Sequence, residues 1–294
     1  MHWPSMARLR NAATRWARRT GRRSWQRVCL NQSVPKMVVF VVGSQRSGTN
    51  MVLQTLRRDP ASWSYNEDDP AVFRDFRLRS RDVVRQAIRS SPARTILLKP
   101  LCDSQWLDRL LEDYENSRAV WVFRHYSDVA NSAVKRWSEG ERAPIRHICR
   151  GEFDKLGWIG ERLSQETIRL VRDVYRDDVS LHESAVLVWC IRNRLFFDMR
   201  LNADERVRLV KYEDLVSAPS RALPPLFEFV GCRFRPAFAT IARTSSIRKE
   251  VPPRLHPEIR RIADAMMHTL EEAYCDGPKG RRHGAGSTIT AADA

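Results

Sequence analysis

The stretch VVFVVGSQRSGTNMVL, residues 38–53, joins an apolar run, a polar loop bounded by glycines and the start of a helix. The apolar run ends at Gly43, and apolar residues resume with helical spacing after Gly48. In such a turn, backbone N–H groups and the positive end of the helix dipole face an anion. The stretch therefore predicts a loop that binds a phosphate-type ligand, with an ordinary strand-to-helix turn as the alternative.

The side chains of this loop indicate which kind of anion it suits. A guanidinium can fork onto phosphate oxygens, and the hydroxyl and amide groups that follow add donors at the helix start. A nucleotide-hydrolysing P-loop carries a lysine directly after its second glycine, but a threonine stands at that place here. This difference disfavours an ATPase or kinase that grips a triphosphate with magnesium, and we expect no metal. The binding candidates are Arg46, Ser47, Gly48, Thr49 and Asn50.

On either side of the loop, short apolar runs alternate with helical patterns. The runs predict strands at residues 37–43, 95–99, 118–123 and 207–212. Continuous apolar runs of this length are typical of parallel strands that helices cover on both faces. Helical patterns occupy residues 47–58, 80–90, 103–115, 126–138, 152–176 and 181–200. The order predicts an α/β fold: a P-loop NTPase-like three-layer sandwich with a central parallel sheet. Residues 138–206 lack a strand pattern, so we expect a helical insertion over one edge.

Length and charge suggest one main domain with two basic or polar extensions. The chain has 294 residues, 43% of them hydrophobic, and a formal charge of +16. We expect a basic, flexible leader at 1–36, the main domain at 37–275 and a disordered, glycine-rich tail at 276–294. Residues 1–36 hold nine cationic side chains and no acid. This composition fits an amphipathic helix at an anionic membrane surface, a disordered leader or an organelle transit peptide.

Cysteine spacing and hydropathy bear on the compartment. The six cysteines are scattered and form no C-x-x-C pair, which predicts reduced thiols and not a zinc or redox site. No apolar run approaches the ~18 residues of a membrane span, and the N-terminus lacks the apolar core of a secretory signal. We therefore predict a cytoplasmic protein, with peripheral membrane contact through the leader as an open option.

Two motifs together resemble the sulfotransferases, enzymes that use 3′-phosphoadenosine 5′-phosphosulfate (PAPS) as donor. The sequence Arg-Ser-Gly-Thr after an apolar strand resembles their 5′-phosphosulfate loop. A second strand and helix, VWVFRHYSDVANSAVKRW at residues 120–137, places Arg124 and Ser132 eight residues apart. In the family, that pair at that spacing binds the 3′-phosphate, and Arg136 matches a further basic contact in some branches. Ser132 and Arg136 share one helical face, so the three side chains can converge on one dianion.

A third stretch supports the resemblance, which covers about residues 37–275. VRLVKYEDLVSAPSRALPPLFEFVGC, residues 207–232, resembles the Tyr-Glu-Asp-Leu strand and the Leu/Phe-rich helix found late in many members. Tyr212 is either a contact on the adenine side of the donor or a core tyrosine. Where the family often shows Asp-Pro after the 3′-phosphate arginine, this chain has His125-Tyr126. The resemblance also implies a lid over the donor near residues 243–256, with Ser245, Ser246 and Arg254 as candidates.

The resemblance implies sulfuryl transfer, which needs cations for the developing charge and a base for the acceptor. Arg46 is the first cation. Lys99 is the second, because it ends a strand at the crevice where open α/β proteins bind ligands, and sulfotransferases commonly carry a lysine there. A surface lysine is the alternative at this position.

The catalytic base follows from the branch of the family that the chain resembles. The cytosolic small-molecule branch uses a histidine just after that lysine, whereas this chain reads Pro100-Leu101-Cys102. Tyrosylprotein and many glycan-type relatives use a glutamate after the loop helix, and Glu67 matches its place. Asp68 and Asp69 are the candidates if the register shifts, and a solvated acidic turn is the alternative.

The predicted function is transfer of a sulfuryl group from PAPS to a hydroxyl or amine, with release of 3′-phosphoadenosine 5′-phosphate (PAP). The resemblance is closer to the glycan, tyrosylprotein and bacterial branches than to the cytosolic small-molecule branch. A small molecule, glycan, lipid or peptide is the expected acceptor. The alternatives are a P-loop-type kinase that uses a nucleotide triphosphate and a non-catalytic binder of anions or membrane surfaces. Nucleic acid is disfavoured as a partner, and the sequence does not indicate an oligomeric state.

Overall fold

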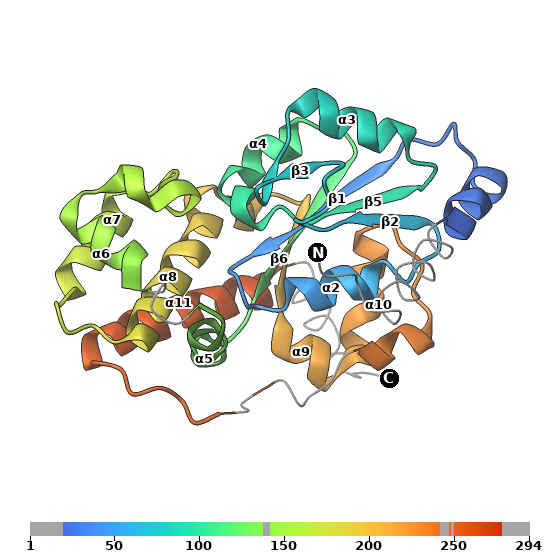
Figure 1. Cartoon of the computed structure of the whole chain (residues 1–294). Helices are drawn as coiled ribbons and strands as arrows, with labels where there is room; N and C mark the ends of the chain where they lie inside the picture. The colour runs from blue at the N-terminus through green and yellow to red at the C-terminus, as the bar shows by residue number, and fades with distance from the viewer. Residues whose placement is uncertain (1–19, 138–141, 242–246, 248–249, 278–294) are drawn as a thin grey trace, which may run out of the picture.

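The centre of the protein is a five-stranded sheet in the order β2-β5-β1-β6-β7, in which every pairing is parallel (Figure 1). The computed structural model describes residues 20–137, 142–241, 247 and 250–277. The strands of the sheet are β1 (Met37–Gly43), β2 (Ser62–Tyr65), β5 (Thr95–Leu98), β6 (Ser117–Phe123) and β7 (Val207–Lys211). The predicted central parallel sheet is therefore confirmed.

Alternate residues of each strand enter two separate cores. In β1, Val39 and Val41 pack in one core, whereas Phe40 and Val42 pack in the other. One face is covered by α2 (Thr49–Leu56), α9 (Tyr212–Ser217) and α10 (Pro219–Phe229). The opposite face is covered by α3 (Arg81–Ser90), α4 (Leu107–Glu112), α5 (Tyr126–Trp137), α8 (Leu181–Asp198) and α11 (Pro257–Asp276). The result is the predicted three-layer sandwich (Figure 1).

The predicted helical insertion lies between α5 and β7. It contains α6 (Arg142–Arg150), η3 (Phe153–Gly160), α7 (Gln165–Val174) and α8, and the described part of this range has no strand. The single helix predicted over 152–176 is wrong. The backbone leaves the helical region at Gly157 (φ 53°) and Arg162 (φ 59°), and Ser164 then caps α7 by accepting a hydrogen bond from the Thr167 amide.

Four strands lie where the apolar runs predicted them, within one residue at either end. The edge strand β2 was not predicted, because SWSY is only four residues long and alternates serine with aromatics. The helix predicted over 103–115 is a 3₁₀ segment, η1 (Leu101–Trp106), followed by α4. The remaining elements are β3 (Phe73–Arg74), β4 (Arg77–Leu78), η4 (Leu201–Ala203) and η5 (Pro236–Ile241).

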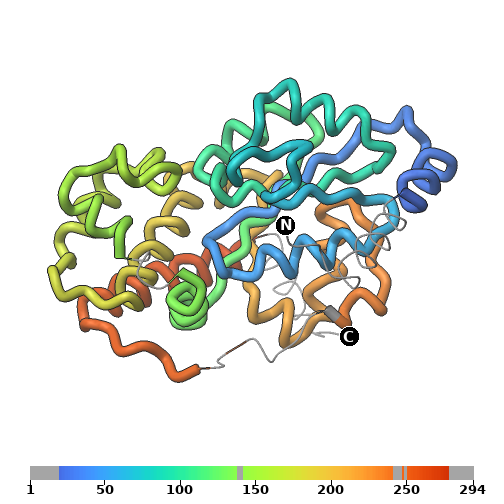
Figure 2. Tube along the Cα trace, in the orientation of Figure 1, coloured from blue at the N-terminus to red at the C-terminus, as the bar shows by residue number. Residues whose placement is uncertain are grey.

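Part of the predicted leader is helical, from residue 20 to residue 29. Gln26 is fully buried and donates hydrogen bonds to the carbonyls of Pro60 (2.8 Å) and Ser62 (3.0 Å), so this helix rests on the edge strand β2. Figure 2 shows it at the end of the molecule opposite α6 and α7. Residues 1–19 and 278–294, and Ser245 and Ser246 of the expected lid, lie outside the described residues.

Because the Cys232 thiol is buried, we expect the folded protein to lose stability at alkaline pH. Burial raises the pKa of Cys232 to about 12, above its ordinary value of 9.0. The folded protein then keeps this proton at a pH where the unfolded chain releases it, so the free energy of unfolding falls as pH rises above about 9. The slope approaches roughly 1.4 kcal/mol per pH unit for one thiol.

Urea unfolding of Cys232→Ala across this pH range checks the prediction, and the variant should show a shallower decline than the wild type. The matched control is Cys29→Ala, because Cys29 is exposed. An unchanged decline in Cys232→Ala would contradict the assignment.

Candidate functional site

The loop between β1 and α2 needs glycine at two positions, because its backbone lies very close to neighbouring groups there. Gly43 (φ 135°) and Gly48 (φ 95°) lie in the region that favours glycine. A Cβ atom on Gly43 would lie 2.2 Å from the Val122 carbonyl oxygen, and one on Gly48 would lie 2.1 Å from the Tyr212 ring. The two glycines therefore let β6 and the Tyr212 ring approach the loop. Arg46 also has a positive φ, 65°, which places a strained residue inside the loop.

The loop contains a buried hydroxyl to which no described residue forms a hydrogen bond. Ser47 is fully buried, and its Oγ has no hydrogen-bond partner among the described residues. Thr49 is also buried and begins α2, whereas Asn50 is exposed. Buried polar groups are nearly always satisfied, so an orphan hydroxyl beside a helix N-terminus fits an anion that accepts its hydrogen bond.

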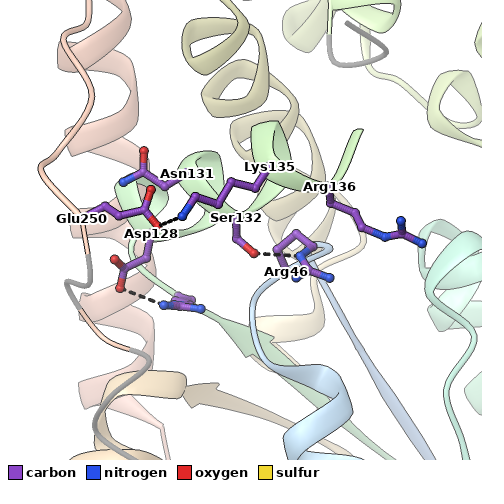
Figure 3. Close-up of a pocket in the computed structure, with 8 residues that line it drawn as sticks. Arg46, Asp128, Asn131, Ser132, Lys135, Arg136 and Glu250 are labelled. Atoms are coloured by element: carbon purple, nitrogen blue, oxygen red, sulfur yellow. Dashed lines mark hydrogen bonds and ion pairs between the residues drawn. The ribbon is translucent and has the colours of Figure 1, made fainter. Parts of the chain in front are cut away.

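The second predicted motif meets the first at a direct contact. Arg124 follows β6, and Ser132 lies on α5 two turns later. The Arg46 Nε donates to Ser132 Oγ at 2.9 Å, which ties the β1–α2 loop to α5 (Figure 3). Arg124 is only 9% exposed, and its guanidinium lies 3.0 Å from the Asp128 carboxylate and 4.7 Å from the Tyr212 ring centroid. The structure thus brings the two motifs together.

These side chains line one cavity of about 450 Å³. Figure 3 shows Arg46, Ser132 and Arg136 at one end of the group and Asp128, Asn131 and Glu250 at the other. Burial lowers the pKa of Arg46, and the positive charges of Arg136 and Arg124 lower it further. Such mutual repulsion among cations is relieved when an anion binds between them. The lining residues are Arg46, Arg124, Asp128, Asn131, Ser132, Lys135, Arg136 and Glu250.

Four lining residues were missed from the sequence. Asp128 lies four residues before Ser132 on the same helical face, and Asn131 and Lys135 share the neighbouring face, so helical spacing could have identified all three. Glu250 has no such signal, because its ion pair with Lys135 at 2.5 Å joins residues far apart in the chain. The Asn131 amide also donates to the Val251 carbonyl at 3.3 Å, which anchors the same segment over α5.

Tyr212 packs as a wall between the two motifs. It is 6% exposed, with its ring against Gly48 and beneath the Arg124 guanidinium. The structure therefore gives Tyr212 a packing role at the site, and its predicted contact with adenine stays a prediction.

The departure at His125-Tyr126 is accommodated in the turn before α5. The His125 Nδ1 accepts a hydrogen bond from the Ser127 amide at 3.2 Å, as a helix-capping side chain would. The His125 amide donates to Glu213 at 2.9 Å, and Tyr126 donates its hydroxyl proton to Asp264 at 2.5 Å. These contacts stabilise the turn without the proline that the resemblance leads one to expect.

Glu67 and Lys99 form an ion pair at the same edge of the sheet. Lys99 follows β5 and is 1% exposed, and its Nζ lies 2.9 Å from the Glu67 carboxylate. Asp68 accepts a hydrogen bond from the Asn66 side chain at 2.7 Å, and Asp69 accepts one from the Ala71 amide at 3.1 Å. Among the three acidic candidates, Glu67 is thus the one with a described ion pair to Lys99.

A charged network holds the chain that follows Lys99. Asp103 accepts hydrogen bonds from the Arg77 Nε (2.6 Å) and the Leu78 amide (2.8 Å), and Arg77 also pairs with Glu161 at 2.8 Å. From α8, the fully buried Arg192 donates to the Leu101 carbonyl at 3.3 Å, and burial lowers its pKa to about 10. These contacts tie the helical insertion to the strand end that carries Lys99, which favours a preorganised site.

Within the described residues, no group of three or more His, Cys, Asp and Glu side chains is placed to hold a metal ion.

Comparison with known proteins gives likenesses to solved structures only. No family model and no curated protein matches the sequence. The fold is similar to a sulfotransferase domain of the curacin biosynthetic pathway, with TM-score 0.45 and 16% identity over 80% of this chain and 98% of that one. It is similar to a sulfotransferase from Alicyclobacillus acidocaldarius, with TM-score 0.44 and 16% identity over 83% and 95% of the two chains. Mouse sulfotransferase SULT7A1 complexed with PAP gives TM-score 0.43 and 14% identity over 90% and 93%.

Proposed function

We propose that this protein is a sulfotransferase that moves a sulfuryl group from PAPS to an acceptor hydroxyl or amine and releases PAP. The observation that carries the proposal is the hydrogen bond from Arg46 to Ser132, 2.9 Å long. It joins two strand-to-helix anion sites, predicted separately, in one cationic cavity. Each is suited to a phosphate-type group, so together they suit a ligand with two anionic ends.

The donor would lie across both motifs. The loop residues Arg46, Ser47 and Thr49, with Gly48 and Asn50, would bind the 5′-phosphosulfate, and the orphan Ser47 hydroxyl supports that placement. Arg124, Ser132 and Arg136 would bind the 3′-phosphate. Asp128 holds the Arg124 guanidinium 3.0 Å away and so orients it toward the cavity.

Glu67 would accept the proton of the acceptor, and Lys99 would stabilise the negative charge on the leaving phosphate oxygen. As the acceptor oxygen bonds to sulfur, its proton passes to the Glu67 carboxylate and the bond between sulfur and the donor phosphate oxygen breaks. Protonation removes the negative charge that Lys99 faces at 2.9 Å. The ammonium, now without a counter-charge, can stabilise the phosphate oxygen that leaves, together with Arg46.

Titration with PAP tests the proposal. We expect tight binding that is the same in EDTA and in magnesium, and binding of ATP at least about tenfold weaker. The expectation for ATP follows from Thr49, which stands where a triphosphate-binding loop has lysine. Magnesium-dependent binding of ATP that is tighter than that of PAP would favour a kinase. Binding of neither would leave only a general anion surface and overturn the proposal.

The acceptor is identified by a transfer assay. The protein is incubated with labelled PAPS and a cell extract, and mass analysis shows whether a small molecule, glycan, lipid or peptide gains sulfate.

A further inference from the structure

The helix at residues 20–29 is attached to the domain by polar contacts. Arg22 donates to the Asp59 carbonyl, and the buried Gln26 donates to two carbonyls beside β2. The Arg23 guanidinium stacks 4.5 Å from the Trp63 ring centroid. Contacts from two successive turns fix how the helix faces the domain, and they also fix which side chains point outward.

The outward side of this helix is apolar and basic. Trp25 is 41% exposed and Val28 is 85% exposed, and Arg27 and Cys29 between and beside them are also exposed. An isolated exposed valine or tryptophan is ordinary on a protein surface. An indole and a valine three positions apart lie on one helical face, however, and here an arginine lies between them in sequence.

The surface around the helix adds positive charge. Arg57, Arg94 and Arg233 are exposed, and each lies near a residue that the helix contacts. The Arg94 backbone amide donates a hydrogen bond to the Ala61 carbonyl at 2.9 Å, and the Arg233 backbone amide donates one to the Asp59 carboxylate at 2.8 Å. Asp59 is 4% exposed, and its other carboxylate oxygen accepts from the Ala61 amide at 3.0 Å. This acid is thus buried and bonded to backbone, whereas the arginines face solvent.

We propose that this surface, defined by Trp25, Arg27, Val28, Arg57 and Arg233, docks on an anionic lipid bilayer. Tryptophan and valine would enter the interface, and the arginines would face lipid phosphates. Residues 1–36 carry nine cationic side chains and no acid, which complements an anionic membrane. Duplex nucleic acid offers phosphates but no apolar layer for Trp25 and Val28, so the membrane is the better fit. No described helix is long and apolar enough to cross a membrane, and the predicted cytoplasmic location stays a prediction.

Vesicle flotation with the full chain tests docking independently of transfer activity. The protein should float with vesicles that contain phosphatidylglycerol and much less with pure phosphatidylcholine, and high salt should weaken the binding. The double variant Trp25→Ser/Val28→Ser should lower the partition coefficient roughly tenfold on anionic vesicles while PAP binding stays unchanged.

Matched control variants distinguish binding through this surface from nonspecific adsorption to vesicles. Phe76→Ser removes an exposed aromatic (58%) and Val251→Ser an exposed valine (86%) elsewhere, and both should float as the wild type does. Arg27→Glu should weaken binding, whereas Arg169→Glu on α7 should not. Flotation of the Trp25/Val28 variant equal to that of the wild type would overturn the proposal. So would binding to duplex DNA without binding to anionic vesicles.

Discussion

Replacing Arg124 with alanine is expected to weaken PAP binding by roughly tenfold to a hundredfold. The guanidinium is 9% exposed and paired with Asp128 at 3.0 Å. Its removal would delete charge-assisted hydrogen bonds to the proposed 3′-phosphate and would leave the Asp128 carboxylate without the Arg124 charge, so that this carboxylate repels the ligand. Calorimetric titration with PAP measures the loss.

A control at the start of the strand that leads to Arg124 distinguishes loss of binding from loss of folding. Arg118 lies at the other end of β6, with its guanidinium 5.0 Å from the Phe229 ring centroid. Arg118→Ala should bind PAP as the wild type does, although it also loses an arginine, from the start of the strand that Arg124 follows. If Arg124→Ala binds PAP with wild-type affinity, the 3′-phosphate assignment fails. If both variants lose affinity equally, the loss reflects a damaged fold.

Glu67→Gln is expected to lower kcat by about a hundredfold or more and to leave PAP binding nearly unchanged. The amide oxygen can still accept a hydrogen bond from the Lys99 ammonium, now 2.9 Å from the carboxylate, but it cannot take the proton of the acceptor. Single-turnover transfer with saturating PAPS separates chemistry from product release.

The neighbouring acids provide the matched controls for this prediction. Asp68→Asn and Asp69→Asn remove a charge of the same kind one and two positions away, and both should retain most of the turnover. A larger loss in either than in Glu67→Gln would move the base to that residue. Because Lys99 is 1% exposed, thermal melting of Glu67→Gln should accompany the kinetics, so that any loss of folded protein is counted.

Sequence was sufficient for the fold wherever periodicity was strong. The runs that became β1, β5, β6 and β7 are mainly apolar because helices cover both faces of the sheet, and this pattern is visible without a structure. β2 was not predicted, because an edge strand of four residues can form without a continuous apolar run. The helix predicted over 152–176 was broken by backbone at Gly157 and Arg162, where a local positive φ overrides the apolar spacing.

For the site, the two motifs could be identified from the sequence, but the direct contact between their side chains could not. Arg46 and Ser132 are 86 residues apart, and only the β1–β6 pairing brings them within hydrogen-bond distance. The pairing of Glu67 with Lys99 similarly follows from β2 and β5 being neighbours. Glu250 was beyond prediction, because its approach to Lys135 depends on a segment without regular secondary structure.

The Tyr212 ring lies between the loop that contains Gly48 and the guanidinium of Arg124. The ring packs against Gly48, and the Arg124 guanidinium lies 4.7 Å from the ring centroid. If the donor binds as proposed, each of its phosphates would lie beside a residue that packs against this ring, so the ring would couple the two halves of the site. A ligand with one phosphate would then pay the ordering cost of both halves and gain the contacts of one, so the ring as well as the charges would favour doubly anionic nucleotides.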